Sequence, residues 1–211
     1  MPHFSQSDIN KMDQRYRANF INSLSGFKSA NLVGTVSKEQ QTNLSIISSA
    51  FHIGADPALM GFINRPHSVD RHTLENLIDI GYYTINHVNT GIIDQAHQTS
   101  ARYSREESEF TETGLSPLWH EGFSAPFVSE SFVRIGLEYK EHHTLMNNTV
   151  MVLGEIIMVD IPEDSVQEDG LVDMTITNTV AVSGLDSYHA PKKIKRLGYA
   201  KPHQPVCIID N

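Results

Sequence analysis

The chain has 211 residues, of which 39% are hydrophobic and 19% are charged, and its formal net charge is −9. This size and composition suit one large domain with a packed core, and they exclude a chain that is disordered throughout. The acidic balance argues against a nucleic-acid-binding surface, which needs clustered lysine and arginine, although a small anionic ligand needs only a local group of donors.

The chain has one cysteine, Cys207, so it cannot form an intrachain disulfide. Its first residues include no apolar stretch of the kind found in signal peptides, and no signal peptide is expected. No run approaches the roughly 18 apolar residues of a membrane span. These features together predict a cytoplasmic protein.

The first predicted element is a helix over residues 5–25, with Gly26 as its stop. Its apolar residues recur at helical spacing, so we expect a surface helix with one buried stripe. The residues of this stripe are Ile9, Met12, Tyr16, Phe20 and Leu24. Residues 1–26 are therefore assigned to an N-terminal helix that precedes the main domain.

Three short strands are predicted next, over residues 31–37, 42–51 and 58–64. Short turns join them, and parallel pairing would require connections of about a dozen residues, so the strands are expected to be antiparallel. A helix over residues 73–81 and a strand over residues 82–88 follow.

A second helix is predicted over residues 91–103, capped by Asn89 or Thr90. Residues 104–130 mix acidic, glycine, proline and aromatic residues. We expect a short helix or two and a long loop there, and long loops often act as lids or interface arms.

Two long apolar-rich strands, over residues 131–146 and 149–161, form the strongest strand signal in the sequence. Asn147-Asn148 between them predicts a hairpin turn, because asparagine tolerates positive φ. The order of elements favours a small antiparallel barrel with helices in its connections. We assign residues 27–200 to this domain and residues 201–211 to a C-terminal tail.

The sequence lacks several well-defined catalytic motifs. It contains no glycine-rich dinucleotide or nucleotide loop, no nucleophile elbow and no H-E-x-x-H metal motif. Its 11 histidines are scattered, and no pair has the i,i+4 spacing of ligands on a helix. His142 and His143 are adjacent and point to opposite faces of a strand. No metal site is predicted.

The segment Ser48-Ser49-Ala50-Phe51 ends a predicted strand with small side chains. Small residues allow a flat ligand to approach the backbone, whose N–H and C=O groups suit a planar heteroaromatic ring. The alternative interpretation is a strand end with local serine hydrogen bonds.

A basic, hydroxyl-rich segment lies one strand further on, just before the helix that begins near residue 73. It contains Arg65, Ser68, Arg71, His72 and Thr73. Helix N-terminal amides together with arginine and threonine suit an anion, and a phosphate in particular. The alternative is an ordinary capped helix with solvated arginines. The two segments together match the needs of a mononucleotide such as FMN.

In their order and spacing, these segments resemble the flavin reductase-like family of FMN-binding split barrels. The family has an N-x-x-x-x-S-S/A-F segment, a D/P-P-L strand, a T-L-x-N helix and an F-x-V-N strand. The corresponding segments of this chain are 43–51, 56–57, 73–77 and 83–86. A late hairpin that ends at residues 154–156 and a basic tail extend the resemblance over roughly residues 27–200.

The resemblance implies a mainly β fold with helices, namely a six-stranded antiparallel split barrel of the FMN-binding type. It also implies a homodimer with FMN near the subunit interface. The residues expected to contact the ring and ribityl chain are Asn43, Ser45, Ser48, Ser49, Ala50 and Phe51. The residues expected to hold the phosphate are Arg65, Ser68, Arg71 and Thr73.

Such a protein is expected to be an oxidoreductase that takes a hydride from NADH or NADPH at the flavin N5 and reduces free flavin or another small acceptor. An FMN-binding electron-transfer or storage protein without nicotinamide turnover is the first alternative. A structural dimer without flavin is the second.

His143 is the candidate catalytic residue, for contact with nicotinamide or substrate, against the alternative of a surface histidine. The basic tail either closes over the cofactor of its own or the other subunit, or is solvated. Its basic residues are Lys192, Lys193, Lys195 and Arg196.

Overall fold

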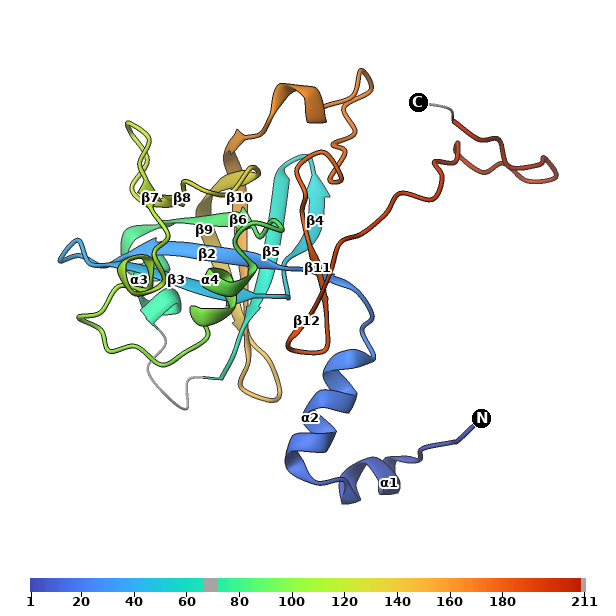
Figure 1. Ribbon diagram of the computed structural model, residues 1–211, viewed down its shortest axis with the longest axis horizontal. Helices are drawn as coiled ribbons and strands as arrows, with labels where there is room; N and C mark the ends of the chain where they lie inside the picture. The colour runs from blue at the N-terminus through green and yellow to red at the C-terminus, as the bar shows by residue number, and fades with distance from the viewer. Residues whose placement is uncertain (67–71, 210–211) are drawn as a thin grey trace.

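A computed structural model describes residues 1–66 and 72–209. Its largest element is a seven-stranded antiparallel sheet with the order β3-β2-β6-β9-β10-β5-β4 (Figure 1). The strands of this sheet are β2 (Asn31–Val36), β3 (Thr42–Ile47), β4 (Phe51–Ala55), β5 (Ala58–Asn64), β6 (Tyr82–His87), β9 (Arg134–Thr144) and β10 (Val150–Asp160). A mainly β protein with antiparallel strands is therefore confirmed. The sheet has seven strands where six were expected, because the predicted strand 42–51 ends at Ile47 and β4 follows as a further strand of which only Phe51 was in the prediction.

The two long strands β9 and β10 join the two halves of the sheet. β9 pairs with β6 through residues 134–138, and β10 pairs with β5 through residues 150–155. The two strands also pair with each other along most of their length, with two register shifts that bend the hairpin. Asn148 has φ 62° in the connecting turn, which confirms the predicted Asn147-Asn148 hairpin.

The space between the two halves is filled with apolar side chains. Buried members of this core include Val33, Phe62, Leu74, Leu77, Tyr83, Ile85, Leu137 and Val152. A Cβ atom on Gly154 would lie 2.3 Å from the Tyr83 hydroxyl oxygen, so a glycine at this position leaves room for the tyrosine. Burial raises the pKa of the Tyr83 hydroxyl above its ordinary value. The glycine of the 154–156 motif therefore has a packing role.

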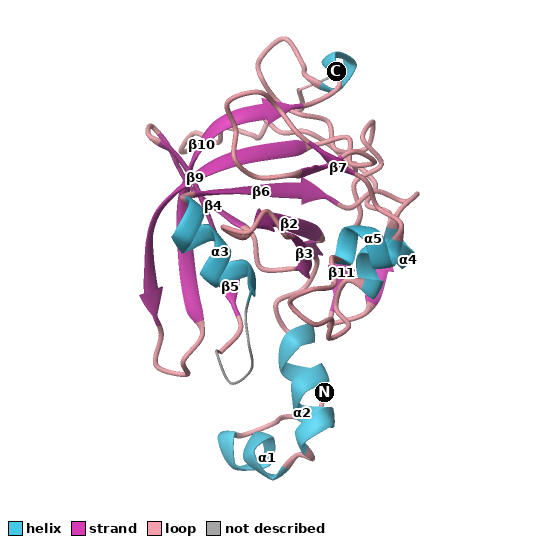
Figure 2. Ribbon diagram, turned by 90° about the vertical axis from the view of Figure 1, so that its left-hand side faces the viewer, coloured by secondary structure: helices cyan, strands magenta, loops and turns pink. Residues whose placement is uncertain are grey.

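Three helices lie against this sheet or its edge: α3 (His72–Ile80), α4 (Ile93–Gln98) and α5 (Glu109–Thr113). α3 packs against β2 and β3, whereas α4 and α5 lie together beside β3 (Figure 2). Leu74 and Leu77 of α3 are buried, whereas Ile78 is 43% exposed. The first turn of α3 is thus placed over polar residues of β2 and β3.

The segment between β6 and β9, residues 88–133, is called the insertion, and it covers the free edge of β3. The Leu44 N–H donates to the Glu109 carboxylate at 2.9 Å, and the Ile46 N–H donates to the Thr99 hydroxyl at 3.0 Å. An uncovered edge strand would leave these donors open to pairing with another chain. Burial raises the pKa of the Glu109 carboxyl, and its bond to the Leu44 N–H opposes that rise. The predicted short helix within residues 104–130 is confirmed, and it protects the sheet edge.

We expect Glu109→Ala to lower the free energy of unfolding by about 2 kcal/mol, because it leaves the buried Leu44 N–H without a partner. Urea denaturation of the purified protein measures this loss. Glu112→Ala is the matched control, since Glu112 is an exposed carboxylate on the same short helix. Equal stability of the two variants would contradict this account of the β3 edge.

The N-terminal segment differs from the prediction of one helix over residues 5–25. It forms α1 (Gln6–Lys11) and α2 (Gln14–Ser23), and neither helix has a buried residue. Asp13 accepts hydrogen bonds from the Arg15 and Tyr16 N–H groups, so it caps a new helix and ends the first. The prediction of one helix with a buried stripe is therefore wrong, although Gly26 does follow the end of α2, with φ 72°.

The other connections also differ from the prediction in part. α4 is shorter than the predicted helix 91–103, and neither Asn89 nor Thr90 caps it, since its N-cap residue is Ile92. Short strands form two further small sheets: β1 (Lys28–Ser29), β11 (Ala181–Ser183) and β12 (Ser187–His189) in one, and β7 (Pro117–Leu118) and β8 (Phe127–Val128) in the other. A 3-10 turn covers Glu163–Ser165. Within the described ranges, no helix has the length and apolar character needed to cross a bilayer.

Candidate functional site

A buried polar cluster lies where α3 starts above β3. The Thr73 hydroxyl oxygen is 3.0 Å from the Asn43 amide nitrogen and 3.0 Å from the Ser45 hydroxyl oxygen. Thr73 itself is only 7% exposed. Asn43 and Ser45 are two residues apart on one strand, so their side chains share a face. The structure thus brings together three of the residues predicted from the sequence to contact a cofactor.

Two further residues fix this cluster, and the sequence analysis did not assign them to the site. Thr35 of β2 accepts a hydrogen bond from Asn43 and another from Asn76 of α3, each at 3.2 Å. Thr35 lies opposite Asn43 in the β2–β3 register. The signal in the sequence was the pairing of two polar residues across a predicted hairpin. The bond from the Asn43 amide to the Thr73 hydroxyl shows that Asn43 positions Thr73.

The segment from Ser48 to Ala50 lies between β3 and β4 and is half-buried. The Ser49 hydroxyl donates to the Ile63 carbonyl at 3.0 Å and accepts from the Ile63 N–H at 3.1 Å. This pair of hydrogen bonds holds the segment that follows β3 against β5. Because the hydroxyl proton is used within the protein, Ser49 offers a ligand its backbone rather than its side-chain donor.

The backbone of Ser48, Ser49 and Ala50 is open for hydrogen bonding. Within the part of the chain that the structure describes, their backbone N–H and C=O groups make no hydrogen bond. Half-buried backbone groups that make no bond within the protein are available to a ligand or to water. Ser48 is three residues beyond Ser45, roughly 10 Å along an extended chain. A ligand that contacts both the open backbone and the Thr73 cluster must therefore be elongated, and these residues fit FMN.

Phe51 is the first residue of β4 and lies across from Gly61 of β5. A Cβ atom on Gly61 would come within 2.8 Å of the Phe51 ring. The ring thus rests on the backbone of β5 at the edge of the candidate site, and its predicted contact with the cofactor remains a prediction.

The predicted phosphate residues are only partly within the described structure. Arg65 follows β5 directly and is exposed, and its carbonyl accepts a hydrogen bond from the Asn64 amide at 3.2 Å. Ser68 and Arg71 lie outside the described residues. Arg105 of the insertion forms an ion pair with Glu75 in the first turn of α3. The sequence analysis did not predict that the insertion brings this additional arginine close to the helix start.

His143 lies on β9 opposite Met151 of β10, and Met151 lies opposite Ile63 of β5. Residues that face each other across neighbouring strands share a face of the sheet. His143 is therefore in line across the sheet with Ile63, which lies two strands away and is the residue that bonds to Ser49. Its side chain is half exposed, with Nε2 3.5 Å from the Glu141 carboxylate. Its catalytic role remains a prediction.

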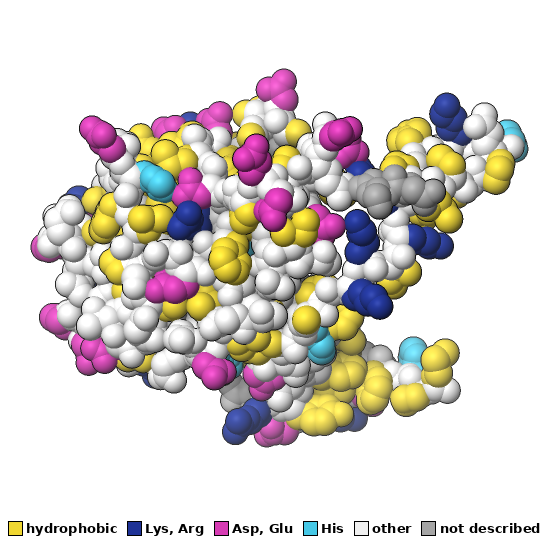
Figure 3. Space-filling view, turned by 45° about the horizontal axis from the view of Figure 1, so that its top comes forward, with side chains coloured by type: hydrophobic (Ala, Val, Ile, Leu, Met, Phe, Trp, Pro, Cys, Tyr) yellow, Lys and Arg dark blue, Asp and Glu magenta, His cyan; other side chains and the backbone are white. Residues whose placement is uncertain are grey.

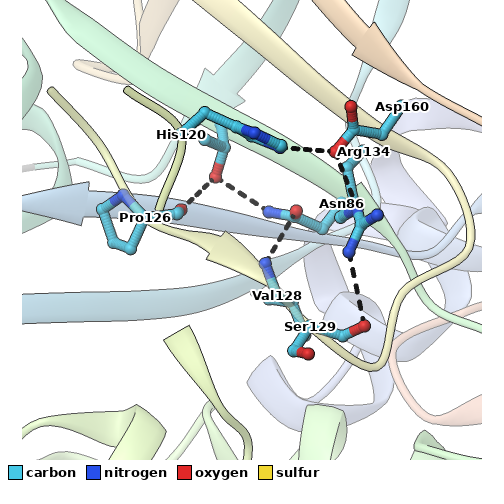
Figure 4. A network of polar contacts seen from close by, with 8 residues as sticks. Asn86, His120, Pro126, Val128, Ser129, Arg134 and Asp160 are labelled. Atoms are coloured by element: carbon cyan, nitrogen blue, oxygen red, sulfur yellow. Dashed lines mark hydrogen bonds and ion pairs between the residues drawn. The ribbon is translucent and has the colours of Figure 1, made fainter. Parts of the chain in front are cut away.

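A separate polar group lines a surface hollow of about 580 Å³ beside the start of β9 and the end of β10. His120 Nε2 lies 2.6 Å from the Asp160 carboxylate, and Arg134 Nε lies 3.2 Å from the same oxygen (Figure 4). The Ser131 hydroxyl in this hollow is buried and has no partner among the described residues. The sequence analysis missed this group, because its members are far apart in the chain.

The bent β9–β10 hairpin, the two half-sheets and the helix that covers a polar cluster define the class of this protein, a split barrel with a candidate nucleotide groove. The sequence profile of the flavin reductase like domain matches residues 24–178. The chain therefore belongs to the flavin reductase-like family, which confirms the resemblance. Family membership supports a flavin as the cofactor and oxidoreductase chemistry.

Three relatives illustrate this assignment. A split-barrel protein from Shewanella frigidimarina, provisionally assigned as a flavin reductase, is 53% identical, with a TM-score of 0.91 over 95% of this chain and 100% of its own. Nitrilotriacetate monooxygenase component B from Bacillus cereus is 17% identical, with a TM-score of 0.81 over 92% of this chain and 97% of its own, and it shows the fold alone. The uncharacterized Bacillus subtilis protein YwrF is 25% identical over 127 residues, which are 60% of this chain and 62% of YwrF.

Proposed function

We propose that the protein is an FMN-dependent oxidoreductase that uses NADH or NADPH to reduce free flavin or another small acceptor. The observation that carries this proposal is the open, half-buried backbone of Ser48, Ser49 and Ala50, which lies along β3 from the Thr73 cluster. The backbone of 48–50 and the Thr73 cluster are together called the groove. A planar ring with donors and acceptors along one edge matches the part of the groove formed by the backbone of 48–50. An anionic group matches the part of the groove formed by the Thr73 cluster at the start of α3.

The residues of the groove have separate roles in this proposal. The backbone of 48–50 binds the ring edge, and its N–H donors stabilise negative charge that develops there. The hydroxyls of Ser45 and Thr73 bind the sugar chain and the phosphate, together with the helix amides and Arg65. Bound FMN supplies the redox chemistry, as a hydride acceptor and electron donor, so the protein's task is binding and orientation.

The assay that tests the proposal is NADH and NADPH oxidation by the purified protein, with and without added FMN. We expect oxidation that depends on FMN and on the protein. Bound flavin without nicotinamide turnover would instead identify an electron-transfer or storage protein. A protein that neither binds FMN nor acquires flavin absorbance would contradict the proposal and leave a structural role for the barrel.

We expect Thr73→Val to weaken FMN binding by about 1–3 kcal/mol, because valine removes a buried hydroxyl at the helix start. Arg71→Ala tests the sequence-based assignment of Arg71 to the phosphate and is expected to have an effect of the same size. Fluorescence titration of FMN gives both dissociation constants. Thr111→Val, at an exposed position of α5, is the control. Unchanged dissociation constants in both variants would mean that the phosphate lies elsewhere.

A further inference from the structure

The hollow beside the start of β9 and the end of β10 carries polar groups that the proposed function does not use. Its polar lining residues come from the insertion and from both strands, and they are His120, Ser129, Ser131, Arg134 and Asp160. Figure 4 shows the His120 and Arg134 side chains both directed at the Asp160 carboxylate. Because separate parts of the chain meet there, the fold itself builds this arrangement.

This hollow is far from the groove along the sheet. Met151 of β10 lies opposite Ile63, the residue that bonds to Ser49. Asp160 is the last residue of β10, nine residues after Met151. That separation is roughly 30 Å along the strand. Within one chain the two sites are therefore separate, and a ligand of the hollow can be bound together with a flavin.

Arg134 is the cationic group of the hollow, and only part of its guanidinium is used within the protein. Nε lies 3.2 Å from the Asp160 carboxylate, and Nη1 donates to the Ser129 carbonyl at 3.5 Å. Nη2 makes no bond among the described residues, and the side chain is 22% exposed. A guanidinium held in this way presents its remaining donors in a fixed direction, which suits a carboxylate.

Ser131 gives a second, independent indication of a ligand. The residue lines the hollow but is only 2% exposed, and its hydroxyl has no hydrogen-bond partner in the part of the chain that is described. A buried hydroxyl without a partner costs free energy, and a ligand oxygen that accepts from it removes this cost. A carboxylate has two oxygens, so one such group can accept from both Ser131 and Arg134.

Asp160 limits the charge that the hollow accepts. The oxygen that faces Arg134 also lies 2.6 Å from His120 Nε2. An ionised carboxylate only accepts, so Nε2 is the donor, and the His120 ring is held in place against Phe127, with centroids 5.0 Å apart. One arginine beside one carboxylate leaves little net charge. A monoanion therefore suits the hollow better than a phosphate dianion, which Asp160 would repel more strongly.

Apolar side chains border these polar groups. Phe132 is 48% exposed and Val159 is 49% exposed, and both line the hollow. The apolar part of a ligand gains free energy when it packs against such side chains. Elsewhere the surface is rich in acidic groups, and Figure 3 shows Asp and Glu side chains spread over one face of the body. An anion thus needs a local group of donors like the one in the hollow.

We propose that the hollow binds a small organic acid with one carboxylate. The carboxylate accepts hydrogen bonds from Arg134 and Ser131, and the apolar part of the ligand packs against Phe132 and Val159. The site is separate from the groove, so this proposal does not rest on the proposed flavin chemistry.

A titration followed by NMR tests the site with the full ¹⁵N-labelled chain and added FMN. The probe is phenylacetate, which joins one carboxylate to an apolar ring. We expect its binding to shift the amide signals of residues 129–134 and to leave those of residues 48–50 unchanged. Phenylacetamide, the neutral ligand of the same shape, and inorganic phosphate are each expected to bind at least about tenfold more weakly.

Two variants test the assigned donors. Arg134→Lys keeps a cation beside Asp160 but loses the planar fork, and it is expected to weaken phenylacetate binding at least about fivefold. Ser131→Ala removes a hydroxyl that has no partner in the described chain, so the variant is expected to fold and to bind about three- to tenfold more weakly. Arg102→Gln, at an exposed arginine elsewhere on the insertion, is the control and is expected to bind as the unmodified protein does.

Several results would overturn the proposal. One is a folded protein in which residues 129–134 do not respond to phenylacetate, or in which residues 48–50 respond instead. Another is a phenylacetamide or phosphate affinity equal to that of phenylacetate. Unchanged phenylacetate affinity in either Arg134→Lys or Ser131→Ala would also contradict it.

Discussion

Gly34→Ala is expected to destabilise the protein by roughly 3–5 kcal/mol, above the usual range for one extra methyl group in a core. A Cβ atom on Gly34 of β2 would lie 2.3 Å from the Pro126 carbonyl oxygen and 2.5 Å from the Thr84 hydroxyl oxygen. The Thr84 hydroxyl donates a hydrogen bond of 2.7 Å to the Pro126 carbonyl oxygen. The end of the insertion therefore crosses directly over β2, and only glycine permits the approach.

Thermal and urea denaturation measure this effect. Gly54→Ala is the matched control, because Gly54 is also in a strand and a Cβ atom there meets only the Pro57 carbonyl at 3.5 Å, an ordinary contact. The control is expected to change stability by less than about 1 kcal/mol. A Gly34→Ala protein as stable as the control would show that the insertion moves aside freely.

The sequence predicted those parts of the fold that depend on local pattern. The six predicted strands were found because β-branched and aromatic residues are bounded by turn residues, as at Asn147-Asn148. The end of β3 at Ile47 and the separate strand β4 were not predictable in the same way. This break between the strands depends on the hydrogen bonds between the Ser49 hydroxyl and the Ile63 backbone, which join residues that are 14 positions apart.

The candidate site shows the same limit. The sequence placed Asn43, Ser45 and Thr73 in one site through the family resemblance, and the structure brings them together. The group of His120, Arg134 and Asp160 gave no local signal, because it exists only where β9 and β10 meet the insertion. Long-range pairing, rather than residue type, decides which of the 11 histidines acquires a partner.

The N-terminal helices α1 and α2 give a further lesson about amphipathic patterns. The apolar spacing in residues 5–25 predicts a helix with one apolar face, but it does not say whether that face packs against the rest of the chain. The pattern predicted burial within one chain, but α1 and α2 bury no residue and extend away from the barrel (Figure 1). A periodic stripe is thus evidence for packing, and its partner must be sought in the structure.

His87 is expected to make stability fall steeply below neutral pH. Burial lowers the pKa of His87 to about 4, and its ring contacts the Thr179 hydroxyl, with Nδ1 at 3.4 Å. An unfolded histidine has a pKa of about 6.5. Between these two values the unfolded chain binds a proton that the folded protein does not, so the full stability is present above pH 6.5 and is lost as pH falls towards 4. The loss from this residue is about 2 kcal/mol at pH 5 and about 3 kcal/mol at pH 4.

His87→Gln isolates this contribution from that of the carboxylates. The variant is expected to unfold at a similar temperature to the unmodified protein at pH 7.5, and to unfold roughly 4–8 °C higher at pH 5, because glutamine takes up no proton. His52→Gln, at an exposed position of β4, is the control and is expected to leave the pH profile unchanged. If His87→Gln and the unmodified protein lose stability in parallel between pH 6.5 and pH 4, His87 does not remain neutral in the folded protein.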